Sequence, residues 1–144
     1  LPELKEWGQL IAQFLKPGGR FVLAEFHPAL WMFDDDFKAL AFSYFNIEPC
    51  IEENAPSYTD LSATAASKGD APKLLSYYWN HSLADVFQAL MTAGLQMSHF
   101  SEYDYSPYDA FNNTVKSTQG HQIKGFEGKL PMVFALEMVK PSNF

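Results

Sequence analysis

The chain of 144 residues has the length of a single domain, and its apolar fraction of 47% is enough to form a core. Its formal net charge of −7, from 10 basic and 17 acidic residues, argues against nucleic acid as the main partner, because surfaces that bind nucleic acid are usually basic. The single cysteine, Cys50, excludes an internal disulfide and leads us to expect a cytoplasmic protein, and no apolar run reaches the roughly 18–20 residues of a membrane span.

The first predicted elements are a helix over residues 2–16 and a strand over residues 20–27. Apolar residues recur at helical spacing in the first segment, and Pro17 and Gly18 end the helix. The strand is almost continuously apolar, which is typical of strands covered on both faces. In open α/β sheets the carboxyl ends of such strands line the ligand crevice.

A long irregular segment over residues 28–79 follows this strand. Its first part is rich in aromatic residues, and its small polar residues 61–72 predict a loop. We interpret the whole segment as an inserted cap or lid with one or two short helices and room for a short strand, because structureless loops of this length are uncommon. The acidic run Asp34-Asp35-Asp36 is interpreted as a solvated turn, since hard-cation sites need spaced ligands. We expect no metal site.

The last third of the chain predicts a helix and two strands. Residues 82–94 form the helix, in which Ser82 and Asp85 have the spacing of a capping box and Gly94 ends the last turn. A strand of mixed character follows over 95–105. A polar connection then leads to a mostly apolar strand over 132–139.

This order of elements resembles the C-terminal half of a class I S-adenosylmethionine-dependent methyltransferase, and more narrowly the small bacterial methyltransferases of the type 11/12 kind. The segments Leu10–Pro28, Tyr77–Tyr105 and Leu130–Pro141 carry the resemblance and cover about half of the chain. The family places Leu-Lys-Pro-Gly-Gly just before its fifth strand. The resemblance implies an α/β fold, namely strands five to seven of a Rossmann-like seven-stranded sheet, with strand seven antiparallel and inserted between five and six.

The family also holds its cofactor on a Gly-x-Gly-x-Gly loop, and this chain contains no Gly-x-Gly. Residues 1–144 are therefore expected to be the C-terminal half of one methyltransferase domain, with its insert at 28–79. The resemblance implies S-adenosylmethionine as the cofactor of the complete protein and a small-molecule methyl acceptor as its substrate. We expect this chain to supply the acceptor side, not to bind the cofactor appreciably on its own and to contain no transferable cofactor-binding residue.

Two histidines are candidates for the catalytic base. His27 follows the strand at its carboxyl end, and His81 precedes the capping Ser82. An imidazole near neutral pKa can accept the proton of a hydroxyl or ammonium acceptor. The alternatives are a turn histidine before Pro28 and a residue that only fixes the entry to the helix.

Four more residues are candidates for contact with the acceptor: Glu25, Trp31, Tyr78 and Trp79. The aromatic residues would form a wall or a box around a planar or cationic group, and Glu25 stands at the rim of the expected crevice. The alternatives are ordinary packing of the rings in the core and a solvated position for Glu25.

A non-catalytic α/β ligand-binding or interaction domain is the other interpretation of the chain. The aromatic content and the acidic balance suit it equally well. In either case the strand over 20–27 is expected to lack its usual neighbour, and bare apolar edges pair with other strands. We therefore expect a dimer or a swapped assembly.

Overall fold

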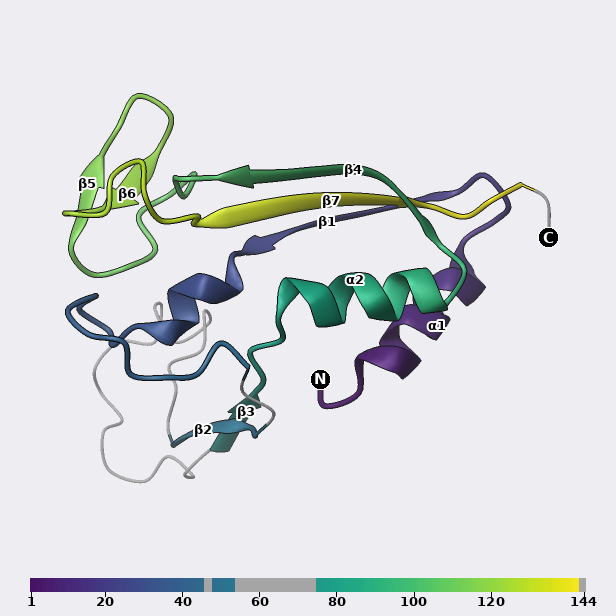
Figure 1. The fold of residues 1–144 in the computed structure, drawn as a ribbon, viewed down its shortest axis with the longest axis horizontal. Coiled ribbons are helices and arrows are strands. Elements are labelled where there is room, and N and C mark those ends of the chain that lie inside the picture. The colour runs from purple at the N-terminus through teal and green to yellow at the C-terminus, as the bar shows by residue number, and fades with distance from the viewer. Residues whose placement is uncertain (46–47, 54–74, 143–144) are drawn as a thin grey trace, which may run out of the picture.

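The computed structural model describes residues 1–45, 48–53 and 75–142, so the loop predicted over 61–72 lies outside the described residues. The elements, in chain order, are α1 (Leu4–Phe14), β1 (Arg20–Phe26), the 3₁₀ helix η1 (Pro28–Met32), β2 (Cys50–Glu53), β3 (Leu75–Tyr78), α2 (Leu83–Thr92), β4 (Gln96–Tyr103), β5 (Thr114–Lys116), β6 (His121–Ile123) and β7 (Val133–Val139) (Figure 1).

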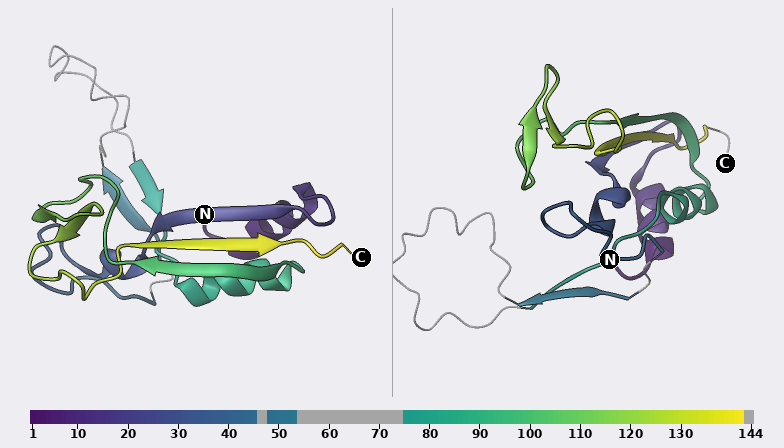
Figure 2. Two further views of the ribbon diagram at one scale, coloured as in Figure 1. Left: turned by 90° about the horizontal axis from the view of Figure 1, so that it is seen from above. Right: turned by 60° about the vertical axis from the view of Figure 1, so that its left-hand side comes forward.

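The main sheet has three strands in the order β1-β7-β4, and β7 is antiparallel to both neighbours (Figure 2). Leu136 of β7 pairs with Leu23 of β1 and with Phe100 of β4. Because both outer strands are antiparallel to β7, they run parallel to each other. The predicted order and direction of the three strands are therefore confirmed.

Both helices cover the same face of this sheet (Figure 1). Along β7, Phe134, Leu136 and Met138 are buried beneath the helices, and the residues between them lie on the opposite face. Leu90 of α2 and Leu95 belong to the same buried cluster. The strands are thus covered on one face by the described helices, where the apolar run of β1 predicted two covered faces.

The two helices cross with their backbones close together at Gly8 of α1. A Cβ atom at this position would lie 2.6 Å from the carbonyl oxygen of Ala89 in α2. Only glycine allows this approach without separating the helices. The same part of α1 contacts the sheet, because the rings of Trp7 and Phe21 meet edge to face at 5.9 Å.

Both predicted helices are present but shorter than predicted, with Leu4–Phe14 observed for 2–16 and Leu83–Thr92 for 82–94. Gly94, just after the cap of α2, has a φ angle of +87°, which favours glycine, whereas Gly18, with a φ angle of +76°, lies in the turn before β1 and not at the end of α1, whose cap is Leu15. Ser82 and Asp85 form the reciprocal hydrogen bonds of a capping box. At the end of α1 the apolar spacing does not correspond to burial, because the side chain of Phe14 is 82% exposed.

Strand β4 contains a bulge that sequence alternation does not predict. Its pairing with β7 shifts between Met97 and His99, so the two residues do not lie on one face as the sequence predicts. Phe100 instead packs into the helix-covered core and contacts Phe87 of α2 edge to face at 5.0 Å.

The segments between the main elements form two small ladders and a second core. In the insert, β2 pairs with β3, and β5 pairs with β6 within the predicted polar connection. The second core lies beyond the carboxyl ends of β1 and β4. Its buried residues are Leu30, Phe37, Ile123, Leu130 and Met132. The insert thus contains a short helix, η1, as expected, and two short strands where room for one was expected. The β5–β6 ladder and the second core were not predicted.

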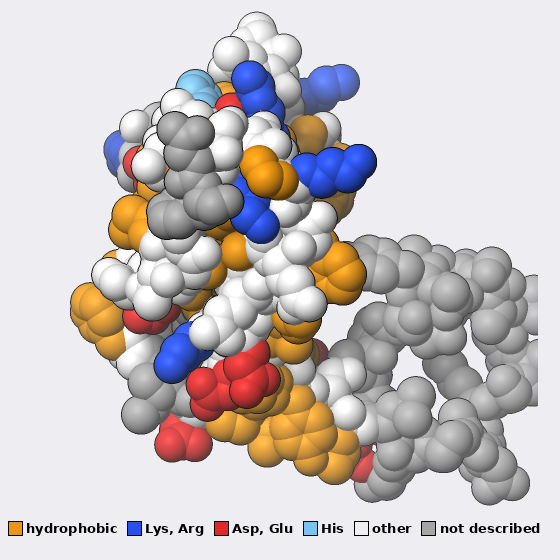
Figure 3. Space-filling model, turned by 90° about the vertical axis from the view of Figure 1, so that its right-hand side faces the viewer, with side chains coloured by type: hydrophobic (Ala, Val, Ile, Leu, Met, Phe, Trp, Pro, Cys, Tyr) orange, Lys and Arg blue, Asp and Glu red, His pale blue; other side chains and the backbone are white. Residues whose placement is uncertain are grey.

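Neither outer strand of the main sheet, β1 or β4, has a second partner strand among the described residues, and one face of the sheet is exposed. β1 is an outer strand that pairs with β7 only, and its Val22 is 66% exposed. Hydrophobic side chains also reach the surface at the end of the molecule seen in Figure 3. No described helix is long and apolar enough to cross a membrane.

Candidate functional site

The carboxyl ends of β1 and β4 lie at the same end of the sheet, on either side of β7, because the two strands run in the same direction. Met132, just before β7, joins them there: its carbonyl oxygen accepts from the amide of His27 at 2.9 Å, and its amide donates to the carbonyl oxygen of Tyr103 at 2.7 Å. From this end of the sheet the chain continues into η1 on one side and into the segment 104–113 on the other. These two segments enclose the candidate site.

His27 is buried at this end of the sheet, and both of its ring nitrogens are engaged. The ring Nδ1 accepts a hydrogen bond from the amide of Ala29 at 3.1 Å and so caps η1. Nε2 lies 2.9 Å from Oε1 of Glu102 at the end of β4. Since Nδ1 accepts, Nε2 carries the proton of the neutral ring and donates to Glu102. His27 thereby fixes the start of η1 against β4.

The catalytic role of His27 stays a prediction. A general base needs a lone pair that can reach the substrate, and in this arrangement the lone pair on Nδ1 is used by Ala29. The ring also stands perpendicular to Phe134, with centroids 6.4 Å apart. These contacts account for the position of His27 as a cap, which corresponds to the turn-histidine alternative.

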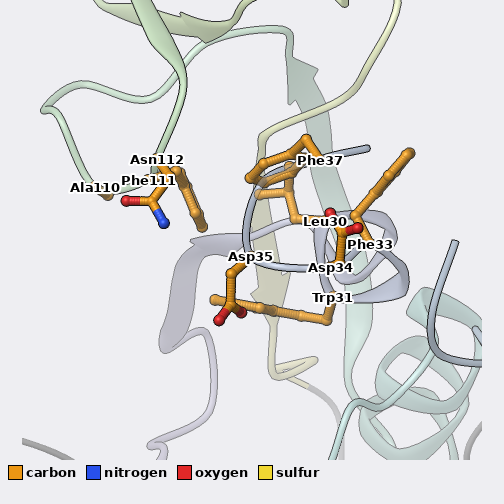
Figure 4. A pocket seen from close by; sticks show the side chains of 9 residues that line it. All are labelled: Leu30, Trp31, Phe33, Asp34, Asp35, Phe37, Ala110, Phe111 and Asn112. Atoms are coloured by element: carbon orange, nitrogen blue, oxygen red, sulfur yellow. The ribbon is translucent and has the colours of Figure 1, made fainter. Parts of the chain in front are cut away.

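A cavity of about 210 Å³ lies between η1, the loop that follows it and residues 110–112 (Figure 4). Most of its lining is aromatic or acidic. The rings come from Trp31, Phe33, Phe37 and Phe111, and the carboxylates come from Asp34 and Asp35. Of the sequence-predicted substrate residues, Trp31 lines this cavity.

The aromatic wall is anchored to the last residue of β1. The ring of Phe26 contacts Phe111 at 4.8 Å, Tyr108 at 5.9 Å and Trp31 at 6.3 Å between centroids, each pair edge to face. Such pairs stabilise a fixed arrangement of rings beyond the area that they bury. Phe111 was missed by sequence reasoning, because it lies in a polar connection with no periodic pattern.

Two residues beside the cavity adopt a left-handed backbone conformation that side chains other than glycine rarely take. Phe37 has φ = 57° and Asn113 has φ = 56°. Asn113 donates from Nδ2 to the carbonyl oxygen of Asp36 at 2.9 Å and so joins the two walls of the cavity. Strained backbone of this kind clusters at functional sites.

The three adjacent aspartates of this loop have different environments. Asp34 accepts a hydrogen bond from the amide of Lys38 at 2.8 Å. Asp36 binds the ammonium group of Lys38 at 2.6 Å, and this hydrogen bond raises the pKa of Lys38. Asp35 is in none of the ion pairs found among the described residues. The acidic run is thus partly a turn, as predicted, and partly the wall of a cavity.

The other predicted site residues lie elsewhere. Trp79 and His81 line a second, more open cavity of about 430 Å³ between the start of α1 and the length of α2 from Asp85 to Thr92. Nε2 of His81 lies 2.6 Å from the carbonyl oxygen of Leu1 and donates to it. Glu25 and Tyr78 are exposed residues that line neither cavity. The structure therefore divides the six residues that the sequence placed at one acceptor site between two cavities and positions outside both, and it keeps only Trp79 and His81 in the same cavity.

The described residues offer no clear fit for S-adenosylmethionine. Among the described residues, the turns that lead from a strand into a helix, after β1 and after β3, contain no glycine, unlike the glycine-rich turn that holds a nucleotide in doubly wound folds. Within residues 1–45, 48–53 and 75–142, no group of three or more histidine, cysteine or acidic side chains could hold a metal ion.

Comparisons with known proteins support the fold class. No protein-family model matches the chain, and no curated protein matches it. Among solved structures, a crystal structure of a "putative S-adenosylmethionine dependent methyltransferase" from Listeria monocytogenes aligns with 97% of this chain at 13% sequence identity and a TM-score of 0.51. The alignment covers 55% of that protein. At this identity the likeness is one of fold.

Proposed function

We propose that this chain supplies the acceptor side of an S-adenosylmethionine-dependent methyltransferase that acts on a small molecule. The observation that carries the proposal is the sheet order β1-β7-β4 with β7 antiparallel between two parallel strands. The resemblance found in the sequence implies this order for strands five, seven and six. The fold likeness to a protein described as a methyltransferase supports the same assignment.

The chemistry that this half of a site contributes is binding and orientation. S-adenosylmethionine, when bound, supplies an activated methyl group. The acceptor must then be held with its reacting lone pair aimed correctly and with water excluded. The cavity beside η1 has the rigid aromatic walls that such positioning requires. His27, His81, Glu25, Tyr78 and Trp79 remain predicted contributors.

The cofactor side of the site is proposed to come from outside residues 1–144. Two observations support this. The chain aligns with about half of the methyltransferase-like structure, 55% of its length, and β1 leaves its outer edge without a partner strand among the described residues. A strand paired along this edge would extend the sheet toward a cofactor-binding half.

The open edge also supports the proposed dimer or swapped assembly. An outer strand with an exposed apolar residue such as Val22 is a template for pairing. Sedimentation of residues 1–144 is expected to show a species larger than one chain. A stable, unaggregated monomer at all concentrations would contradict the pairing.

The test of the proposed function is a comparison of two proteins by calorimetry with S-adenosylmethionine. We expect no appreciable binding to residues 1–144 and binding in the micromolar range to the product of the whole reading frame that encodes them. Methyl-labelled cofactor with a panel of small amines and alcohols would then identify the acceptor. If the whole product binds small ligands and never the cofactor, the chain is a non-catalytic binding domain and the proposal is wrong.

A further inference from the structure

We propose that the cavity between η1 and residues 110–112 binds a small organic cation, with the positive charge held by Asp35 and the face of Trp31. This inference deepens the proposed function by naming a class of acceptor, a molecule that carries an ammonium group apart from the atom that takes the methyl group, because an ammonium nitrogen has no lone pair to attack with. It rests on the proposed function only in treating the bound cation as the methyl acceptor.

The aromatic lining is the first argument. Trp31 is 47% exposed, yet its ring is held in place by edge-to-face contact with Phe26 and by Phe111, whose centroid lies 5.8 Å away. An indole that is fixed on one side and open on the other can accept a cation, and tryptophan gives the strongest cation–π attraction. In Figure 4 the side chains of Trp31, Asp35 and Phe111 lie around the same hollow.

The charge of the lining is the second argument. Asp34 and Asp35 are the charged side chains of the cavity wall, and both are acidic. The lysine of the same loop, Lys38, is bound to Asp36, which does not line the cavity. The carboxylate of Asp35 has no ion-pair partner among the described residues, so a cationic ligand would provide the countercharge.

The size and rigidity of the cavity restrict the ligand. A volume of about 210 Å³ is below the range of about 300–1,000 Å³ that takes drug-sized ligands, so an ammonium headgroup fits where a nucleoside does not. The hydrogen bond from Asn113 to Asp36 holds the two walls at a fixed separation. A bare metal ion suits this lining poorly, because hard cations need six or more oxygen ligands.

The test uses choline and its neutral isostere 3,3-dimethylbutan-1-ol as probes, titrated into residues 1–144 without S-adenosylmethionine. The readout is the NMR shift of the Trp31 indole N–H, assigned with a Trp31→Phe variant. We expect choline to bind about tenfold more tightly than the isostere, in line with a cation–π contact strengthened by a carboxylate. Equal affinities of the two probes would overturn the proposal.

Matched variants show whether the carboxylate of Asp35 itself, and not a change in the fold of the loop, determines the affinity for choline. Asp35→Asn is expected to lower choline affinity about tenfold and to leave the isostere unaffected. Asp36→Asn, a neighbour outside the cavity, is the control and should change neither. Trp31→Leu keeps an apolar side chain and should weaken choline more than the isostere. If Asp36→Asn acts like Asp35→Asn, or if calcium chloride displaces choline, the cavity is not a site for organic cations.

The outcome is independent of the cofactor experiment. Choline binding without any cofactor binding by the whole protein would leave the cavity assigned and the methyltransferase proposal wrong. Cofactor binding without discrimination between choline and its isostere would leave the methyltransferase proposal standing and the cationic acceptor excluded from this cavity.

Discussion

The helix-covered core and the aromatic core beyond the strand ends are built in different ways. The first is formed by regular elements, with alternate residues of β7 buried beneath α1 and α2. The second joins η1 and its following loop to residues more than 80 positions later, such as Ile123 and Leu130. The difference shows that one region stabilises the sheet, while the other uses long-range contacts between loops to shape a cavity.

The largest expected effect concerns the helix-covered core. It is measured by truncating one residue on the buried face of the sheet and one on the exposed face. Leu136→Ala, at a residue that is 1% exposed, is expected to lower the free energy of unfolding by about 3 kcal/mol. Val22→Ala, on the exposed face, should lower it by less than about 0.5 kcal/mol. Chemical denaturation of both variants measures the difference.

A large loss for Val22→Ala would contradict the view that this face is open. The face would then be covered in solution, and the concentration dependence of the unfolding midpoint would show whether a second chain covers it.

A smaller effect tests the strained backbone of the aromatic core. Phe37→Ala and Phe37→Gly both remove the buried ring, and each creates a cavity. Because φ at this position is 57°, the glycine variant is expected to be about 1 kcal/mol more stable than the alanine variant. At ordinary loop positions the order is reversed. Denaturation of the two variants side by side decides between them, and alanine as the more stable variant would rule out left-handed strain here.

The smallest expected effect concerns a carboxylate on the exposed face of β7. The Ser98 hydroxyl donates to Glu137 at 2.6 Å and, with the guanidinium of Arg20, lowers the pKa of Glu137 below its ordinary value. A lowered pKa in the folded state stabilises the fold at pH values above the ordinary carboxylate pKa, and this contribution is lost as the pH falls through the lowered value.

Ser98→Ala should therefore raise the pKa of Glu137. The free energy of unfolding should then fall less, at acidic pH, from the protonation of this residue. Carbon-detected NMR titration of the carboxyl group measures the shift. Ser43→Ala is the control, since Ser43 lies outside the main sheet and its hydroxyl accepts from the amide of Phe45. An unchanged pKa of Glu137 in the Ser98 variant would show that the charges of Arg20 and His99 govern this carboxylate without the hydroxyl.

The sequence predicted the regular half of the molecule because its signals are local. Helical spacing, the glycine at position 94 and the Ser82–Asp85 capping box each depend on residues within a few positions of one another. The order of the three strands followed from the resemblance. The bulge in β4 was not predicted. One extra residue in a strand reverses which side chains face the core, and the amino-acid composition of the strand does not show where this happens.

The candidate site was predicted only in part. Trp31 lines the aromatic cavity and His27 lies at the end of β1, while the roles of both residues toward an acceptor stay predictions. Phe111 could not have been found, because it meets Trp31 across 80 residues of irregular chain. His81 and Trp79 were grouped with them by residue type alone, and the structure places them between the two helices.

The position of β7 has a consequence for how the protein is made. Its residues are synthesised after those of β1 and β4, and they supply the hydrogen bonds that join those two strands. During synthesis on the ribosome, β1 and β4 cannot form their hydrogen bonds to β7 until residues 133–139 have emerged. A premature stop codon before residue 133 would therefore release a chain with both helices and no main sheet, a product that quality-control proteases should degrade.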